Sequence, residues 1–542
     1  MVKQFHYLPA QVKRSLWRLL PAMALAFSIV ISGCGGSGNS PPGGNTPPTP
    51  PVDGPAWWGF GRDAQHSAVS GIASQNLNRI AWSAPVDLAP QYRADGALLA
   101  HYGSPVITSH NTVIVPVKTT AAGGFRFEAR SGDKGALIWS GDSDYILPAH
   151  NWVPSYNLAL TANNRLYAPG AGGKLLVRDN ADSTQGAIRK AVFYGAANYD
   201  VRPAAFDASI FINTPITSDP QGNVFFGFMV TSTNPANLVG GIARIGADGT
   251  GSWVSAATAA GDAAIANVAM NSGPALSNDS RTLYVAVNTA RIPRVIQTGY
   301  LLALDSTTLA VKSKSALIDP GTLARAWVSD DSTSSPTVAP DGAVFFGVLE
   351  SNAPAHNLRG WLLSFDANLS SLGRIPGGFG WDDTASIVPA SMVSSYTGTS
   401  SYLLMSKYNN YIGIATGDGL NRIAIIDPNT SHIDPISGLP IMREVLTILG
   451  PTFESGTSGA VKEWCINTAA VDPLTKSILA NSEDGYLYRW DLVTNTFTQR
   501  IQLTSGIAES YTPTAIGADG AVYAVNNAVL FSITNNGNGG GN

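Results

Sequence analysis

Residues 335–347 read SPTVAPDGAVFFG, and a second apolar run, WLLSFD, follows at residues 361–366. A small residue with proline opens the stretch, an Asp-Gly turn interrupts it, and apolar and aromatic residues fill the rest. Apolar runs rich in β-branched and aromatic residues, bounded by Gly, Pro, Asn and Asp, are typical of strands rather than helices. The stretch therefore predicts three short strands joined by tight turns.

The same three-part unit recurs along the chain. The first part lies at 104–107, 214–216, 273–276, 335–338 and 512–515. The second part lies at 224–227, 283–285, 344–347 and 522–524. The third part ends in Asp and lies at 301–305, 361–366, 423–427 and 486–491. A weaker fourth strand often follows, as at 136–139 and 497–501. Four short strands per unit are typical of the blade of a β-propeller.

Counting the units predicts an all-β fold, a single propeller of eight four-stranded blades over residues 55–534. The first strands begin near residues 104, 155, 214, 273, 335, 386, 467 and 512. Seven blades are an alternative, because the unit at 386–451 is long and irregular. The last unit has room for only three strands before a disordered Gly/Asn tail at 535–542, so we expect Leu77–Trp82 to supply the outer strand. Such an N-terminal strand closes the ring and removes its free edges.

The N-terminal 33 residues have the pattern of a secretory signal peptide. Four basic residues and no acidic residue precede or flank the apolar run Leu19–Ile31, which is too short for a transmembrane helix. Ile31-Ser32-Gly33-Cys34 resembles a bacterial lipobox, which predicts lipidation of Cys34 by palmitate-type acyl chains. Residues 34–54 are rich in Gly, Pro and Ser, and we expect them to act as a tether. Gly35 after the cysteine favours the outer membrane, facing either the periplasm or the cell surface.

Composition and charge exclude several classes of protein. Charged residues make up only 13% of the chain. After the signal segment, 29 basic residues face 37 acidic ones, so the remainder carries a net charge of −8. Nucleic-acid binding requires clustered Lys and Arg, so we expect no nucleic-acid partner. Cys465 is the only other cysteine, which rules out a disulfide within the folded domain; we expect it to be a buried, inert residue, with a catalytic thiol as the alternative.

The repeat resembles a known family. The strands that end in Asp, the Asp-Gly turns and the opening segment at 57–67 (WWGFGRDAQHS) are similar to the pyrroloquinoline-quinone-type propellers, also called quinoprotein alcohol dehydrogenase-like, over about residues 55–534. This family includes quinone-dependent dehydrogenases and non-enzymatic lipoproteins that help to assemble outer-membrane barrels. In the dehydrogenases, the resemblance implies a quinone held between a Trp and a disulfide of adjacent cysteines, with calcium and an Asp base. This chain has no adjacent Cys pair and no Cys-x-x-Cys-His haem motif.

The loops that lead into the first strand of each blade should meet on one face of the channel, and here they are rich in Trp, His and acids. Convergent carboxylates and aromatic rings could bind a cation, a sugar or another polar ligand. The alternative is structural: Asp and Ser satisfy turns, and Trp wedges between blades. The candidate ligand-binding residues are His101, His150, Trp152, Asp330, Asp331, Trp381, Asp382, Asp383, Glu463, Trp464, Glu509 and Tyr511.

A second candidate site lies in the long sixth unit. Asp427, Asn429 and Asp434 alternate as in a calcium loop, but His432 stands where glycine is expected and the closing Glu is absent. A turn-rich insertion is the alternative. Oxygen ligands would favour calcium over zinc. The remaining histidines, such as His110 and His356, are expected in surface loops.

Two functions follow from these observations. The first is a lipid-anchored envelope propeller that binds or scaffolds a protein, a polysaccharide or a small polar ligand, without catalysis. The alternative is a periplasmic quinone-dependent dehydrogenase of alcohols or sugars that uses calcium and pyrroloquinoline quinone. The absent Cys pair favours the first hypothesis, whereas the polar, Trp-rich channel face favours a small ligand.

Overall fold

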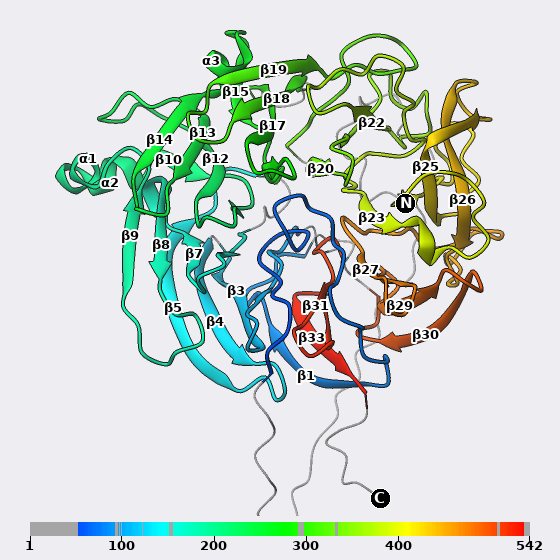
Figure 1. Cartoon of the computed structure of the whole chain (residues 1–542), viewed down its shortest axis with the longest axis horizontal. Coiled ribbons are helices and arrows are strands. Elements are labelled where there is room, and N and C mark those ends of the chain that lie inside the picture. Colours follow the sequence, from blue (N-terminus) through cyan, green and yellow to red (C-terminus); the bar gives the residue numbers. More distant parts are fainter. Residues whose placement is uncertain are drawn as a thin grey trace, which may run out of the picture. The chain divides into compact units, whose positions relative to one another are not determined.

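The fold is described from a computed structural model, over residues 52–92, 96, 98, 100–121, 123–150, 156–290, 297–330, 334–506 and 510–535. These residues build eight antiparallel sheets arranged as the blades of a propeller (Figure 1). The prediction of eight blades is confirmed, and the seven-blade alternative is wrong. No helix in the described ranges is long and apolar enough to cross a membrane.

Blades 1 to 4 are each built from successive strands of the chain. Blade 1 consists of β2 (Val106–Ile107), β3 (Thr112–Thr120), β4 (Gly123–Ser131) and β5 (Leu137–Ile146). Blade 2 consists of β6 (Ala159–Leu160), β7 (Leu166–Pro169), β8 (Lys174–Arg178) and β9 (Ile188–Val192). Blade 3 consists of β10 (Ile210–Ile212), β11 (Thr217–Ser218), β12 (Val224–Val230), β13 (Gly241–Ile245) and β14 (Gly251–Ser255). Blade 4 consists of β15 (Ile265–Val268), β16 (Ala275–Leu276), β17 (Thr282–Thr289), β18 (Gly299–Asp305) and β19 (Val311–Ala316).

Blades 5 to 8 complete the ring. Blade 5 consists of β20 (Thr337–Val338), β21 (Val344–Val348) and β22 (Trp361–Phe365). Blade 6 consists of β23 (Ser386–Pro389), β24 (Tyr402–Tyr408), β25 (Arg422–Ile433) and β26 (Pro440–Leu449). Blade 7 consists of β27 (Ala470–Asp472), β28 (Ser477–Asn481), β29 (Tyr486–Asp491) and β30 (Thr496–Gln502). Blade 8 consists of β31 (Ala515–Ile516), β32 (Val522–Asn526), β33 (Val529–Thr534) and β1 (Arg79–Pro85).

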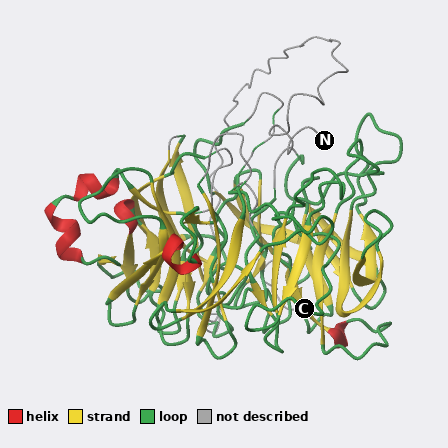
Figure 2. Ribbon diagram, turned by 90° about the horizontal axis from the view of Figure 1, so that it is seen from above, coloured by secondary structure: helices red, strands yellow, loops and turns green. Residues whose placement is uncertain are grey.

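Helices are few and short, as expected from the absence of a helical apolar period. Figure 2 shows them as small additions to a body of strands. They are α1 (Ala196–Val201), α2 (Pro203–Asp207) and α3 (Ala256–Ala260), with single 3-10 turns η2 (Ala171–Gly173) and η3 (Ala390–Met392).

The expected closure of the ring is confirmed. Strand β1 pairs antiparallel with β33, from Arg79 opposite Thr534 to Pro85 opposite Val529, and forms the outer strand of blade 8. Backbone hydrogen bonds therefore join the N-terminal part of the propeller to its C-terminal part. Blade 8 has four strands, of which β31, β32 and β33 come from the C-terminal part and β1 from the N-terminal part.

Blade 5 departs from the four-strand pattern. After β22, the residues Pro376, Gly377 and Gly378 replace an outer strand, because proline removes a ladder donor and glycine weakens a strand. Gly377 forms a single bridge with Leu362. The β25–β26 hairpin of blade 6 covers the gap: the amide of Met442 donates to the carbonyl of Pro376 at 2.9 Å.

A buried histidine ties this hairpin to blade 5. The ring of His356 stacks on Trp361 at 3.9 Å, and its two nitrogens face the carbonyl of Gly360 at 2.9 Å and the carboxylate of Asp434 at 3.1 Å. The expectation that His356 lies in a surface loop is wrong, because its side chain is only 2% exposed. His110 is exposed, as expected.

We expect Asp434→Asn to lower the free energy of unfolding by about 2 kcal/mol at neutral pH, the usual value for a hydrogen bond to a charged group. Burial acts to raise the pKa of Asp434, but hydrogen bonds from His356 and Ser437 outweigh burial and hold the pKa well below its usual range. A carboxyl with a depressed pKa stabilises the fold above its unfolded pKa, near ~4, and this contribution is lost as the pH falls. Denaturant unfolding of the variant and the wild type at pH 7 and pH 3 checks both points. If their free energies of unfolding differ by the same amount at the two pH values, the prediction is wrong.

Candidate channel-face site

Loops from distant blades meet on one face of the propeller. His101, which precedes blade 1, lies 3.4 Å from the side-chain amide of Asn271, which lies between β15 and β16 of blade 4. The same His101 ring contacts Tyr511, which precedes blade 8, edge to face at 4.8 Å between centroids. The expected convergence of the loops is therefore present for these residues, and we call the surface around them the channel face.

A buried lysine is the centre of this face. Lys407, near the end of β24, forms an ion pair with Asp382, and the Tyr511 hydroxyl donates to the other oxygen of the same carboxylate. The side chains of Lys407 and Asp382 are 0% and 4% exposed. Burial opposes the charge of Lys407, yet attraction to Asp382 and Asp383 outweighs it and raises the pKa of Lys407. Asp382 adopts a left-handed backbone conformation, with φ of 49°.

Asp383 is a second buried carboxyl beside this pair. The Ser406 hydroxyl donates to its Oδ2 at 2.5 Å, and its backbone carbonyl accepts from Ser334 at 2.9 Å. Burial raises the pKa of Asp383 to about 7, although Lys407 acts in the opposite direction. His101 is affected likewise: burial, with the nearby charge of Lys407, lowers the pKa of His101 to about 3, so this imidazole is neutral at pH 7.

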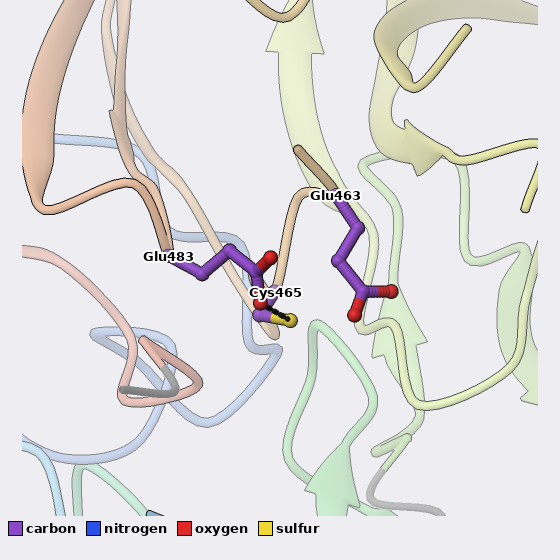
Figure 3. A group of neighbouring side chains, drawn as sticks. All are labelled: Glu463, Cys465 and Glu483. Carbon is purple, nitrogen blue, oxygen red and sulfur yellow. Dashed lines mark hydrogen bonds between the residues drawn. The ribbon is translucent and has the colours of Figure 1, made fainter. Parts of the chain in front are cut away.

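Glu463, Cys465 and Glu483 form a cluster of metal-ligating groups on the same side of the molecule. One ligand atom of each lies within 4.8 Å of the others, and the three side chains point toward a common space (Figure 3). The Cys465 thiol donates to the carboxylate of Glu483 at 3.2 Å. Burial, and then the neighbouring Glu483, raise the pKa of Glu463 to about 8. Within the described residues, a search for three or more His, Cys, Asp or Glu side chains close enough to hold one metal ion finds this group.

Four of the predicted residues make contacts within the protein that fit a structural role. Trp464 is buried between β24, β28 and β29, with its ring against Tyr488 at 5.7 Å, which is the wedge that the structural alternative predicts. Asp330 is buried and accepts from the amide of Met270 at 3.1 Å and from Asn288 at 2.9 Å. His150 is half-buried, with Nδ1 at 2.7 Å from the carbonyl of Pro148. Trp381 is half-buried, and its amide donates to the carbonyl of Arg359 at 3.1 Å.

The residues of the calcium-loop hypothesis are divided between two networks, one with Asp427 and Asn429 and the other with Asp434. Asp427 is buried and accepts from Tyr396 at 2.7 Å and Ser400 at 2.6 Å, whereas Asp434 belongs to the His356 contact described above. Asn429 donates from its backbone amide to Asp427 at 3.0 Å, as in an Asx turn. These contacts favour the turn-rich alternative. The remaining candidates, Cys34, Trp152, Asp331 and Glu509, lie outside the described residues, as do the signal segment and most of the tether.

Sequence reasoning missed two residues of this face and misjudged a third. Lys407 stands within the apolar run YLLMSKY at 402–408, and a lysine inside a buried strand is a signal that a carboxylate partner must lie nearby. Glu483 follows β28 in the Ser-Glu-Asp-Gly turn and carried no distinguishing pattern. Cys465 is buried as expected, but its thiol is directed at two carboxyl groups rather than at an apolar core.

The comparisons with known proteins support the fold and assign no function to this chain. No family model matches the sequence, and no curated protein matches it. Among solved structures, a quinohemoprotein alcohol dehydrogenase from Comamonas testosteroni is similar, with TM-score 0.50 and 11% identity over 88% of this chain and 80% of that chain. The quinohemoprotein alcohol dehydrogenase ADHIIG from Pseudomonas putida HK5 also has TM-score 0.50, with 12% identity over 89% and 76% of the two chains. BamB from Moraxella catarrhalis has TM-score 0.42 and 12% identity over 84% and 99%.

Proposed function

We propose that this protein is a binding module of the cell envelope, anchored by a lipid on Cys34, and that its channel face takes up a cationic ligand. The observation that carries the proposal is a group of four carboxyls and a thiol near one lysine, all buried except Glu463, which is half-buried. The six residues are Asp382, Asp383, Glu463, Glu483, Cys465 and Lys407.

The charge balance of this group supports a cation over an anion. The group sets four carboxyls against one lysine, and that lysine pairs with Asp382. Buried carboxyls that face each other are costly unless a proton or a positive ligand offsets their repulsion. The Cys465 thiol changes the expected metal: calcium prefers oxygen ligands alone, whereas a thiolate with carboxylates suits zinc.

The quinone of the dehydrogenase alternative does not fit this set of residues. Pyrroloquinoline quinone carries three carboxylates, and the described channel face offers one buried cation, Lys407, which Asp382 occupies. The sequence has no second cysteine beside Cys465 to form the disulfide that covers the ring in the dehydrogenases. We therefore derive no oxidation step from this site.

The test is calorimetric titration of the purified full-length protein with Zn²⁺, Ca²⁺ and pyrroloquinoline quinone, each alone and the last also with Ca²⁺. We expect Zn²⁺ to bind most tightly. Glu483→Gln should weaken Zn²⁺ binding by about tenfold or more, since even an indirect partner of a ligand contributes about 10–100-fold. Glu128→Gln is the matched control, because Glu128 is equally buried but pairs with Arg130 at 2.5 Å on blade 1.

Each result has a defined meaning. Zn²⁺ binding that Glu483→Gln weakens and Glu128→Gln leaves unchanged supports the proposal. Calcium-dependent quinone binding with dye-coupled oxidation of an alcohol or sugar would overturn it and make the protein a dehydrogenase. Absence of binding by all three would also overturn it and leave the buried network as a structural device.

A further inference from the structure

A groove of about 820 Å³ lies between blades 2 and 3, away from the channel-face residues. Its floor consists of the buried side chains of Tyr167, Val177 and Phe193. Strand β9 forms one wall, and the turn between β13 and β14 forms the other; β9 and β14 are the outer strands of neighbouring blades (Figure 1). Small-molecule sites typically measure about 300–1,000 Å³, so the groove has the size of a binding site. We call it the rim groove.

The walls of the rim groove are fixed by contacts between the two blades. Arg165 of blade 2 pairs with Asp179 at 2.5 Å and donates to the carbonyl of Ala247 in blade 3 at 3.2 Å. At the other end, a Cβ on Gly251 would lie 2.3 Å from the carbonyl oxygen of Phe193, so the two backbones touch there and only glycine fits. The groove is therefore formed before any ligand arrives, which lowers the entropy cost of binding.

The charged groups of the rim groove neutralise one another. Arg165 and Arg189 share the carboxylate of Asp179, and Lys190 pairs with Asp200. These pairs leave one positive charge over, and the carboxylate of Asp248, which also lines the groove, brings the sum of the charges to zero, so a ligand with a large net charge is not favoured. The same groups present guanidinium donors and carboxylate acceptors along the rim, which suits a neutral ligand that carries many hydroxyls.

An indole supplies the apolar surface that such a ligand needs. Trp253, on β14, lines the groove and is half-buried, and its ring meets Phe228 edge to face at 5.9 Å. A pyranose has an apolar C–H face that packs on an aromatic ring and hydroxyls at its edge that bond to polar side chains. We propose that the rim groove binds a neutral oligosaccharide, with Trp253 as the stacking platform and Arg165, Arg189 and Asp248 as hydrogen-bonding partners. This site is independent of the proposed channel-face function.

The test uses the purified full-length protein on an array of neutral hexasaccharides (cellohexaose, maltohexaose, chitohexaose and xylohexaose), with hexagalacturonate and an acidic peptide as competing classes. Any hexasaccharide that binds is then titrated by calorimetry. Trp253→Ala should weaken its binding by about tenfold or more, because the aromatic surface on which the sugar ring packs is lost. Ala191→Trp, which fills the groove from β9 and keeps the indole of Trp253, should abolish binding.

Tyr300→Ala is the matched control, because Tyr300 is a half-buried aromatic residue of blade 4 that does not line the groove. Near-ultraviolet circular dichroism of each variant checks that the fold is retained. Neutral saccharide binding that is lost in Trp253→Ala and Ala191→Trp and kept in Tyr300→Ala supports the proposal. Binding of only hexagalacturonate or the acidic peptide would overturn it, as would absence of saccharide binding or equal losses in all three variants.

Discussion

Lys407→Met is expected to destabilise the propeller by about 3–5 kcal/mol, the cost of removing one partner of a buried ion pair. The variant leaves the Asp382 carboxylate buried with only the Tyr511 hydroxyl as a described donor. Methionine fills a similar volume, so the loss of stability would come from the missing charge rather than from a cavity. The measurement is denaturant unfolding of the full-length protein, followed by tryptophan fluorescence and circular dichroism.

A double-mutant cycle separates the ion pair from its surroundings. Asp382→Asn retains the side-chain shape and tolerates the left-handed backbone at this position, since asparagine is enriched there. In the double variant Lys407→Met/Asp382→Asn no charge is left unpaired, and we expect most of the stability lost in Lys407→Met to return. A single variant as stable as the wild type would show that the pair is not charged in the native protein. A double variant that is stable but no longer binds Zn²⁺ would separate the site from the fold.

Much of this fold could be predicted because a propeller repeats its local pattern. Apolar strands and tight turns recur from blade to blade, and in four units an Asp ends the third part, at residues 305, 366, 427 and 491, so several weak signals support one architecture. Residues 77–82 were identifiable as the closing strand because the last unit is one strand short. The hairpin that covers blade 5 was not predictable, because its contact with Pro376 joins segments more than 60 residues apart and leaves no local pattern.

The candidate site was harder to predict, for a physical reason. Loops that meet around a channel come from the whole chain. The sequence identified these loops, but it did not show which side chains of different loops contact one another. Asp382 and Tyr511 were identified and lie together, but Lys407, which pairs with the same carboxylate, was missed. Trp464 illustrates the opposite error, because an aromatic residue between blades and one facing a ligand have the same local sequence. Burial and partners distinguish them, and both depend on tertiary structure.

Trp82→Ala should weaken the closure of the ring by about 3–5 kcal/mol, the usual cost of removing a buried tryptophan side chain. Trp82 lies on β1, yet its indole nitrogen donates to the carbonyl of Gly132 in blade 1 at 2.8 Å, and its ring packs on Tyr523 of blade 8 at 5.8 Å. A Cβ on Gly135 would lie 2.5 Å from the ring, so the turn of blade 1 is fitted around the indole. The side chain therefore fastens the closing strand to its own blade 8 and to the neighbouring blade 1.

The position of Trp82 also predicts which strands lose stability in the Trp82→Ala variant. Hydrogen exchange should accelerate first in β1 and β33, because β1 pairs with β33 alone and β33 pairs with β1 and β32. Strands β17 and β18 in blade 4 should exchange as in the wild type. Trp82→Phe keeps an aromatic ring and loses the hydrogen bond. It should lower the free energy of unfolding by about 1 kcal/mol, which is far less than the loss expected for Trp82→Ala. If Trp82→Ala unfolds at the wild-type midpoint with β1 still protected, the closure depends on the backbone ladder alone. If all eight blades lose protection together, the ring is one cooperative unit, and closing it is the step on which the other blades depend.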